Sequence, residues 1–462
     1  MSEFVLNKTP RPVSDVITKH RKISGMFPHP DSLKIFDTLE KFESRSMHGQ
    51  LPVVWDKASQ YQVFDPYGNV WIDFTSTIFV ANAGHAHPKI KKAIEQMIQK
   101  DLLHTYNYPT EIRAKLLEYL IKNTPENFEK VYLMSTGTEA TECLMKLIRM
   151  YGKHANKIKP GIVSFQGAYH GRTIGAAQIG GTEKSQEWIG YSDPNIHQVP
   201  FPYEWELNGC SGKEIFHKHL DMLKEKGVDL QKDISGFVFE SYIGWASGFI
   251  PKDYVQEAAK FCKENKALLT FDEVQGGFGR TGKLFVYEHY EVEPDLIACG
   301  KGISSSLPLS AVLGRKEIMD LPEVGSMSST HSANPLSCAA GLANFKVLLE
   351  EKLIDASKEK GEFFHKRLNE IKEKSQGHIK YVTGKGLLAA LIFCDPITSL
   401  PEKYLPSKIC EIAMESGLLL VHTGRESIKL APPLSIPCDA LEEGLDVLES
   451  IILDQVKKKN AA

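Results

Sequence analysis

The chain of 462 residues exceeds the usual size of a single domain and predicts roughly two domains. Hydrophobic residues make up 42% and charged residues 24% of it, which is typical of a globular protein. The 55 Lys and Arg residues nearly balance the 58 Asp and Glu residues, giving a net charge of -3. This balance argues against a nucleic acid or an acidic membrane as a partner.

The cysteines and the N-terminus indicate the cellular compartment. None of the eight cysteines forms a C-x-x-C pair and no His lies beside them at metal-binding spacing, so we expect reduced thiols and no metal site. The N-terminal MSEFVLNKTPRP lacks the apolar stretch of a signal peptide. The longest apolar run, Leu387 to Cys394, is far shorter than the roughly 20 residues of a membrane helix. These features predict a cytoplasmic protein.

Residues 1–75 predict an N-terminal arm followed by part of a small domain. The first 50 residues contain proline-punctuated pieces (TPRPVS, FPHP) that favour an arm lying on another part of the molecule. The next stretch, VVWDKASQYQVFDPYGNVWIDF, predicts short antiparallel strands, because DPYGN has turn chemistry between runs rich in Val, Phe and Trp.

From about residue 88, short apolar runs alternate with amphipathic helical stretches. This alternation predicts an α/β domain over residues 76–336, with a largely parallel sheet covered by helices on both faces. The predicted strands are Val131–Met134, Ile162–Phe165, Phe237–Phe239, Leu268–Phe271, Leu296–Cys299 and Ala311–Gly314.

Long helical patterns dominate after about residue 337. In DASKEKGEFFHKRLNEIKEK, for example, Phe364, Leu368 and Ile371 recur at helical spacing. Strand-like pieces, KGLLAALIF and SIKLAPP, follow. We predict that residues 337–462 pack with residues 51–75 as a smaller α+β domain built from both chain ends.

Polar segments follow five of the predicted strands. An open α/β sheet binds its ligands at the carboxyl ends of its strands, so these segments predict one pocket. They are STGTEA, QGAYHGR, Glu240, DEVQGGFGRTG and GKGIS.

The segment STGTEATECLMKLIRMYG predicts a helix. Apolar residues recur at helical spacing from Ala140 to Tyr151, and Thr136 and Glu139 stand in the register of a capping box. The free N–H groups of Gly137 and Thr138 would then face an anion such as phosphate. A plain capped helix is the alternative.

Asp272 and Lys301 each follow an apolar strand. A buried carboxylate such as Asp272 needs a partner, and it could be a metal ligand, a general base, the counter-ion of a protonated ring nitrogen or a structural group. Lys301 lies between Gly300 and Gly302, which allow a ligand to approach the backbone closely. In an apolar pocket this lysine would have a lowered pKa and could form a Schiff base with a carbonyl, whereas a solvated lysine is the alternative.

The glycines after Asp272 nearly spell a phosphate-binding P-loop. The spacing Gly277-x4-Gly282-Lys283 matches, but Leu284 stands where that motif needs Ser or Thr to coordinate Mg²⁺. We therefore do not expect nucleotide hydrolysis.

The motifs STGTEATE, YHGRT, FDEVQGGFGRTGKLF, PDLIACGKGIS with PLSAV, and THSANPLSCAA occur in this order. They resemble the class III aminotransferases, the family of the 4-aminobutyrate and ornithine enzymes, and the resemblance runs from FDPYGNVWIDF to KLAPPLSI. It implies fold type I, pyridoxal 5'-phosphate as cofactor and a homodimer with shared active sites. The implied reaction is ping-pong transfer of an amino group from an amine or amino acid to an oxo acid, pyruvate or 2-oxoglutarate. A racemase, epimerase or lyase on the same fold remains the alternative, because the first steps are shared.

The resemblance also gives matching residues their roles. Lys301 corresponds to the Schiff-base lysine that moves a proton, and Asp272 to the carboxylate that keeps the ring nitrogen protonated. The other implied cofactor contacts are Gly137 and Thr138 to the phosphate, Tyr169 and Val274 on the two ring faces, Gln275 to the ring hydroxyl, and Thr330 to the phosphate of the neighbouring subunit.

Four residues bear on the substrate. Arg172 matches an arginine that pairs with a substrate carboxylate, with a structural role as the alternative. Lys429 stands where glutamate-using members have an arginine, and Trp245 stands where they have its glutamate partner. We therefore expect the glutamate-binding switch to be absent, so that a bulkier or neutral group binds near Trp245 and Phe79.

Overall fold

The computed structural model describes residues 6–244 and 247–461, which divide into two compact units. Unit 1 comprises Met1–His87, Arg280–Gly282 and Leu353–Ala462, and unit 2 comprises Pro88–Gly279 and Lys283–Lys352. The sequence pattern set the divisions after residues 75 and 336, whereas the units divide after residues 87 and 352. The boundary lies after residue 352 rather than 336 because the helix Pro335–Glu350 packs against two other helices of unit 2.

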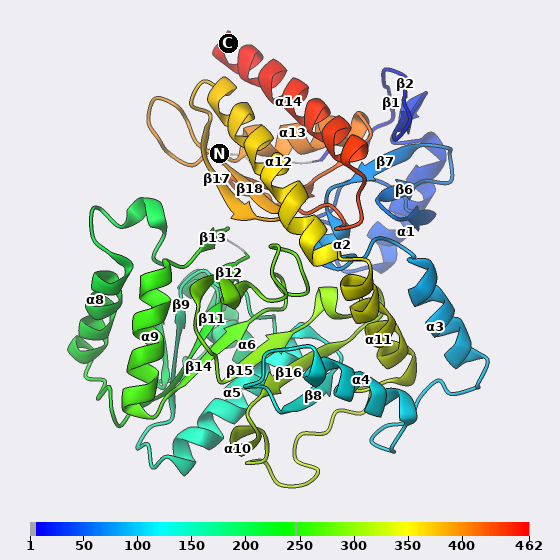
Figure 1. The fold of residues 1–462 in the computed structure, drawn as a ribbon. Helices are drawn as coiled ribbons and strands as arrows, with labels where there is room; N and C mark the ends of the chain where they lie inside the picture. The colour runs from blue at the N-terminus through cyan, green and yellow to red at the C-terminus, as the bar shows by residue number, and fades with distance from the viewer. Residues whose placement is uncertain (1–5, 245–246, 462) are drawn as a thin grey trace. The chain divides into compact units, whose positions relative to one another are not determined.

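Unit 2 contains a seven-stranded sheet in the order β10-β9-β11-β14-β15-β16-β8 (Figure 1). The neighbours from β10 to β15 are parallel, and β16 is antiparallel to both of its neighbours. All six predicted strands are present, whereas β10 has no apolar run and was not predicted. The strands are β8 Lys130–Met134, β9 Gly161–Phe165, β10 Ile196–Val199, β11 Ile234–Glu240, β14 Leu268–Asp272, β15 Leu296–Cys299 and β16 Ser310–Gly314.

Helices cover both faces of this sheet. Val238 belongs to the core cluster formed with α5, whereas its neighbours point to the other face, Phe237 toward Phe216 of α8 and Phe239 toward Tyr254 of α9. Successive residues of a strand point to opposite faces, so the predicted α/β class with a doubly covered, mostly parallel sheet is confirmed. The main helices are α3 Pro88–Ile98, α4 Glu111–Lys122, α5 Gly137–His154, α8 Gly212–Glu225, α9 Lys252–Asn265 and α11 Pro335–Glu350.

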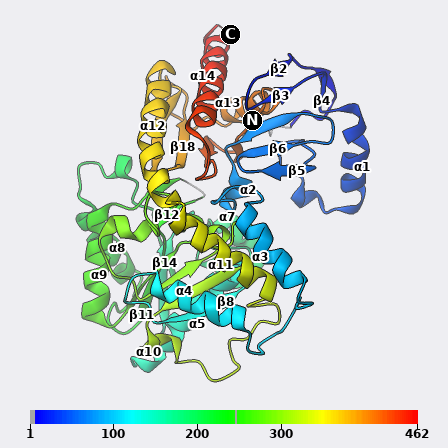
Figure 2. The same cartoon turned by 45° about the vertical axis from the view of Figure 1, so that its right-hand side comes forward.

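Unit 1 is built from both chain ends, as predicted. One of its sheets has the order β2-β3-β7-β6-β5, and β19 from the C-terminal part pairs with β7. The other sheet is antiparallel, in the order β17-β18-β21-β20, and α12 and α14 run side by side (Figure 2). The strands are β2 Val16–Ile17, β3 Lys22–Ile23, β5 Lys57–Ser59, β6 Gln62–Phe64, β7 Val70–Asp73, β17 Ile379–Lys385, β18 Leu388–Phe393, β19 Leu418–Leu419, β20 Val421–His422 and β21 Ser427–Leu430, and the long helices are α1 Leu33–Phe42, α12 Leu353–Lys374, α13 Tyr404–Glu415 and α14 Cys438–Asn460.

The predicted turn chemistry of DPYGN is present between β6 and β7. Asp65 Oδ1 accepts hydrogen bonds from Tyr67 N at 2.9 Å and from Asn69 N at 2.8 Å. The side chain therefore closes the turn, as Asp does in turns generally. Over residues 6–244 and 247–461, no helix has the length and apolar character needed to cross a membrane.

Candidate active site

The N-terminus of α5 lies directly after β8 and Thr136 caps it. Thr136 Oγ1 accepts from Glu139 N at 3.2 Å, and Glu139 Oε2 accepts from Thr136 N at 2.9 Å, so the predicted capping box is present. A Cβ at Gly137 would lie 2.8 Å from Val274 Cγ1, so only glycine fits here without a shift. The N–H groups of Gly137 and Thr138 lie in the first turn and have no carbonyl partner within the helix, which suits them to an anion.

Asp272 is the last residue of β14 and is buried. Its Oδ1 accepts from Val274 N at 2.9 Å, and its Oδ2 accepts from His170 Nδ1 at 2.8 Å. Burial alone would lower the pKa of His170, but the carboxylates of Asp272 and Glu240 outweigh it and raise that pKa. Since each carboxylate oxygen can accept more than one hydrogen bond, Asp272 retains capacity for a further N–H donor.

Lys301 follows β15 in a backbone conformation that L residues rarely adopt, with φ at 45°. A Cβ at the preceding Gly300 would lie 3.0 Å from Val274 Cγ1, so the backbone at Gly300, like that at Gly137, comes close to this valine. Burial lowers the pKa of Lys301 below the ordinary lysine value, and the carboxylates of Glu240 and Asp272 limit the decrease. Backbone strain and a lowered pKa on one lysine are typical of a functional site.

Glu240 is a site residue to which the sequence analysis gave no role. Its Oε2 accepts from Tyr169 N at 2.7 Å and its Oε1 accepts from Gly244 N at 3.0 Å, so it joins two of the loops at the sheet end. Burial raises the pKa of Glu240 to about 7, Asp272 adds to the increase, and His170 opposes it. The available signal in the sequence is its position as an acid directly after the apolar run Phe237–Phe239.

Tyr169 and Arg172 lie on the loop after β9. The guanidinium carbon of Arg172 lies 5.5 Å from the centroid of the Tyr169 ring, within the range of a cation–π contact. Between them, Gly171 has a φ of 134°, and a Cβ there would overlap Thr138 Oγ1. The glycine of the YHGR motif is therefore required by the close approach of this loop to the start of α5.

The structure brings the cofactor residues predicted from unit 2 together, except Thr330. Gln275 lies beside Gly244, because a Cβ on that glycine would lie 2.6 Å from Gln275 Oε1. Thr330 is exposed, and its carbonyl accepts from His104 Nε2 at 2.9 Å in the same chain.

The other predicted substrate residues are not part of unit 2 as the structure describes it. Phe79 and Lys429 belong to unit 1, where they are 1% and 7% exposed. Lys429 is in β21, paired with Ala390. Trp245 lies outside the described residues.

The near P-loop is not a nucleotide site. Gly282 belongs to unit 1 and Lys283 to unit 2, and the next element is a short 3-10 helix that begins at Val286. A P-loop instead leads straight from a strand into an α-helix. No group of three or more His, Cys, Asp or Glu side chains that could hold a metal ion occurs in the part of the chain that the structure describes.

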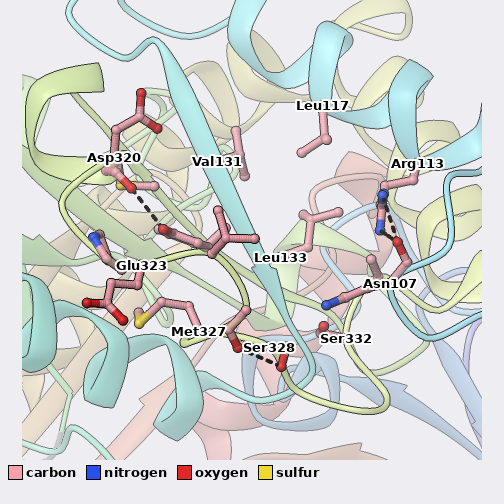
Figure 3. A pocket seen from close by; sticks show the side chains of 16 residues that line it. Asn107, Arg113, Leu117, Val131, Leu133, Asp320, Glu323, Met327, Ser328 and Ser332 are labelled. Atoms are coloured by element: carbon pink, nitrogen blue, oxygen red, sulfur yellow. Dashed lines mark hydrogen bonds between the residues drawn. The ribbon is translucent and has the colours of Figure 1, made fainter.

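A hollow of about 590 Å³ lies in front of the edge strand β8 (Figure 3). Val131 and Leu133 of β8 line it, together with Met327 and Ser328 from the loop that precedes Thr330. Val324 in the same loop is fully exposed. Its lining includes none of the residues clustered around Lys301.

The residues at the sheet end fit a planar cofactor that carries a phosphate. His170 Nε2 and Gln275 Nε2 are buried and have no hydrogen-bond partner among the described residues, and Gly137 and Gly300 both let the backbone come close to Val274. A lysine of lowered pKa and a buried carboxylate complete the set. The fold and these residues define a pyridoxal-phosphate-dependent enzyme of fold type I.

Comparison with known proteins gives the family. The sequence signature described as Aminotransferase class-III matches residues 44–452. An alanine/serine racemase from Pyrococcus horikoshii is 33% identical over 459 residues, covering 96% of this chain and 95% of the racemase. An acetylornithine aminotransferase from Clostridium acetobutylicum is 33% identical over 411 residues, covering 88% and 97%. The solved structure of ornithine aminotransferase from Toxoplasma gondii, described as having PLP at partial occupancy in its active site, matches with a TM-score of 0.80 at 26% identity, covering 93% of this chain and 96% of that one.

The chain belongs to the class III aminotransferase family, whose enzymes depend on pyridoxal phosphate. The family supports amino-group transfer as the reaction rather than the racemase or lyase alternative. Racemisation is the named activity of one of these relatives.

Proposed function

We propose that this enzyme transfers an amino group from an amine or amino acid to pyruvate or 2-oxoglutarate by a ping-pong mechanism. The observation that carries the proposal is Lys301, whose pKa is lowered by burial and which lies at the sheet end near the carboxylates of Asp272 and Glu240. A lysine of lowered pKa gives up its proton more readily, and the neutral amine can then act as a nucleophile and as a proton acceptor.

When bound, pyridoxal phosphate supplies an electron-withdrawing ring that stabilises negative charge on the substrate Cα. Asp272 would accept the N–H of the ring nitrogen, and His170 would hold that carboxylate in place. The N–H groups at the start of α5 would bind the phosphate. Tyr169 and Val274 would lie against the two ring faces, and Gln275 would reach the ring hydroxyl with its buried amide.

Lys301 would move the proton. As a neutral amine, its Nζ would take the proton from the substrate Cα, and as the ammonium it would return a proton in the second half-reaction, which runs in reverse. The Glu240 and Asp272 carboxylates keep the pKa of Lys301 from falling further, so the same group can hold the proton as well as accept it.

Arg172 would bind the carboxylate of an amino-acid substrate. Its contact with the Tyr169 ring would position the guanidinium, whose fork of N–H groups suits a carboxylate. Lys429 in place of the family's arginine, and Trp245 in place of a glutamate, favour a bulkier or neutral group near Trp245 and Phe79. These two replacements favour pyruvate over 2-oxoglutarate as the amino acceptor.

We also propose that the enzyme works as a homodimer in the cytoplasm. The hollow in front of β8, the exposed Val324 and the adjacent Thr330 form a continuous stretch that a second copy would cover, bringing Thr330 to the partner's phosphate. All eight cysteines are free, which fits a reducing compartment.

The test is a half-reaction screen. Holoenzyme is mixed with single amines or amino acids without any oxo acid, and the oxo product is quantified by mass spectrometry. Transamination should yield about one oxo product per active site, and continued turnover should require pyruvate or 2-oxoglutarate. Inversion of an amino acid without oxo product and without an acceptor would instead identify a racemase and refute the proposal.

A further inference from the structure

Residues Ser76–Phe79, labelled α2, form a left-handed turn in unit 1. All four have positive φ, at 45° for Ser76, 51° for Thr77, 59° for Ile78 and 69° for Phe79. L residues adopt this conformation rarely and usually singly, and β-branched side chains suit it least. A run of four therefore needs surroundings that hold it, and such strain gathers at functional sites.

The segment 431–434, directly after β21, holds both flanks of the turn. Before the turn, Ala431 N donates to Phe74 O at 2.7 Å. After the turn, Leu434 N donates to Asn82 O at 2.9 Å. These two bonds fasten the turn to the segment that continues the strand of Lys429.

Arg280 joins the same segments through its side chain and is 0% exposed. Its Nη2 donates to Asn82 Oδ1 at 2.6 Å and to Ser76 Oγ at 3.3 Å. Its Nη1 donates to Pro432 O at 2.5 Å and to Leu387 O at 3.3 Å. Because a guanidinium is a planar fork, these bonds fix the distances between the turn and the chain after β21.

The charge of Arg280 is kept in spite of its burial. Burial lowers the pKa of Arg280 to about 9 and the Asp73 carboxylate opposes the decrease, so the side chain stays a cation at neutral pH. A buried cation is unfavourable unless its N–H groups are paired, so each acceptor must stay in place. Ser76 is itself held, because its Oγ donates to Ala431 O at 2.6 Å.

We propose that Arg280 and the left-handed turn form a clamp that fixes Phe79 relative to Lys429, and that Arg280 sets the preference for the amino donor through these two residues. This inference rests on the proposed function, in which Phe79 and Lys429 contact the substrate. Arg280 is a positioning residue in this arrangement, acting only through the segments that it holds. The donor class it favours is an amine with a bulky or neutral side chain.

The turn is tested by two substitutions at the exposed Thr77. Thr77→Ala and Thr77→Gly both remove the hydroxyl, and only the glycine variant also removes Cβ. At a left-handed residue the glycine variant of the holoenzyme should unfold at a higher temperature than the alanine variant. In a right-handed helix the order is reversed, so a higher Tm for Thr77→Ala would overturn the turn and the clamp with it.

The selecting role is tested by Asn82→Ala with Asn69→Ala as the matched control. Both asparagines are buried in unit 1, at 1% and 2% exposure, and Asn69 Nδ2 donates to Asp65 Oδ2 at 2.7 Å away from the clamp. The readout is the ratio of kcat/KM for a bulky and a small amino donor, which does not depend on the fraction of folded enzyme. We expect Asn82→Ala to change this ratio about fivefold or more and Asn69→Ala to leave it unchanged.

An unchanged ratio in Asn82→Ala, or an equal change in both variants, would overturn the selecting role. If the wild-type enzyme transferred no amino group from any donor, the proposed function would fail and donor selection with it. The Thr77 pair would still report on the turn in that case, so the two failures are distinguishable.

Discussion

Two clusters of buried charge, one in each unit, differ in how fully their hydrogen-bonding groups are paired. Around Lys301, the buried atoms His170 Nε2 and Gln275 Nε2 lack partners within the described chain, and the lysine pKa is lowered. Around Arg280, four of the five N–H groups of the guanidinium are bonded to protein oxygens, and Nε alone of this side chain has no partner among the described residues. Buried polar groups are normally paired, so the first pattern marks a ligand site and the second a structural clamp.

The assignment of the Lys301 cluster as the ligand site would be refuted if the enzyme did not need Lys301. We expect Lys301→Ala to lower kcat by about 10³-fold or more, because the variant loses the nucleophile and the proton carrier together. Lys283→Ala, at an exposed lysine in the same unit, is the control and should leave kcat unchanged. Borohydride reduction followed by peptide mapping should find the cofactor mass on Lys301 of the wild type. Its recovery on another lysine would contradict the assignment.

The unit with the ligand site was also the more predictable from sequence. Its strands are short apolar runs, its polar residues come directly after them, and parallel topology then gathers those residues at one sheet edge. Strand β10 was not predicted because its sequence, IHQV, contains no apolar run. The sequence places Glu240 at a strand end, but it does not show that the loops carrying Tyr169 and Gly244 meet at its carboxylate.

The clamp could not have been predicted, because its parts are distant in sequence and carry no local signal. The turn reads STIF, without the glycine that usually marks a left-handed residue. Arg280 stands among glycines in FGRTG, where a solvated arginine is the ordinary expectation. Its burial depends on Asn82 and Pro432, which lie 198 and 152 positions away along the chain.

Asp272→Asn should produce the next largest effect. The amide keeps the shape of the side chain but loses the negative charge, so we expect kcat/KM to fall by about 10² to 10³-fold. The dissociation constant of pyridoxal phosphate, measured by fluorescence titration, should also increase. Activity close to wild type would mean that Asp272 is structural, leaving the ligand-site cluster without its anchoring charge.

Glu240→Gln tests the ligand-site cluster through the pH dependence of its stability. The pKa of Glu240 is raised to about 7 from 4.5, so its stabilising contribution is fully present below about pH 4.5 and is lost as pH rises to about 7. The difference amounts to at most about 3 kcal/mol. Relative to wild type, the Tm of the uncharged variant should therefore rise between pH 5 and pH 8.

Glu273→Gln is the matched control for this experiment. Burial raises the pKa of Glu273 to about 8, and its carboxylate accepts from Val286 N and Tyr287 N, so the same trend in Tm is expected. Of the two variants, Glu240→Gln should weaken pyridoxal phosphate binding, because Glu240, unlike Glu273, accepts a hydrogen bond from Tyr169 N. Equal effects on cofactor affinity would assign Glu240 a merely structural part.

Arg172→Gln should have a smaller effect that depends on the substrate. Loss of a charge-assisted bond to a carboxylate costs about 1.5 to 2 kcal/mol, which predicts a rise in KM of about 10- to 30-fold for an amino acid. The corresponding decarboxylated amine should be unaffected, so the pair of substrates serves as an internal control. A similar loss for both compounds would indicate that Arg172 acts through the Tyr169 ring rather than on the carboxylate.

The smallest effect is expected from Thr136→Ala, which removes the cap of α5. Loss of an N-cap hydroxyl costs about 1 kcal/mol of folding stability, and Thr110→Ala should cost a similar amount because Thr110 caps α4 in the same way. The two helices differ in their surroundings, because the N-terminus of α5 lies beside Val274, whereas α4 packs against α11. Thermal unfolding should therefore show a similar loss of Tm in both variants. Only Thr136→Ala should also weaken pyridoxal phosphate binding, by a few-fold. If both variants bound the cofactor equally well, the start of α5 would be an ordinary capped helix, and the phosphate would have to be held by other groups.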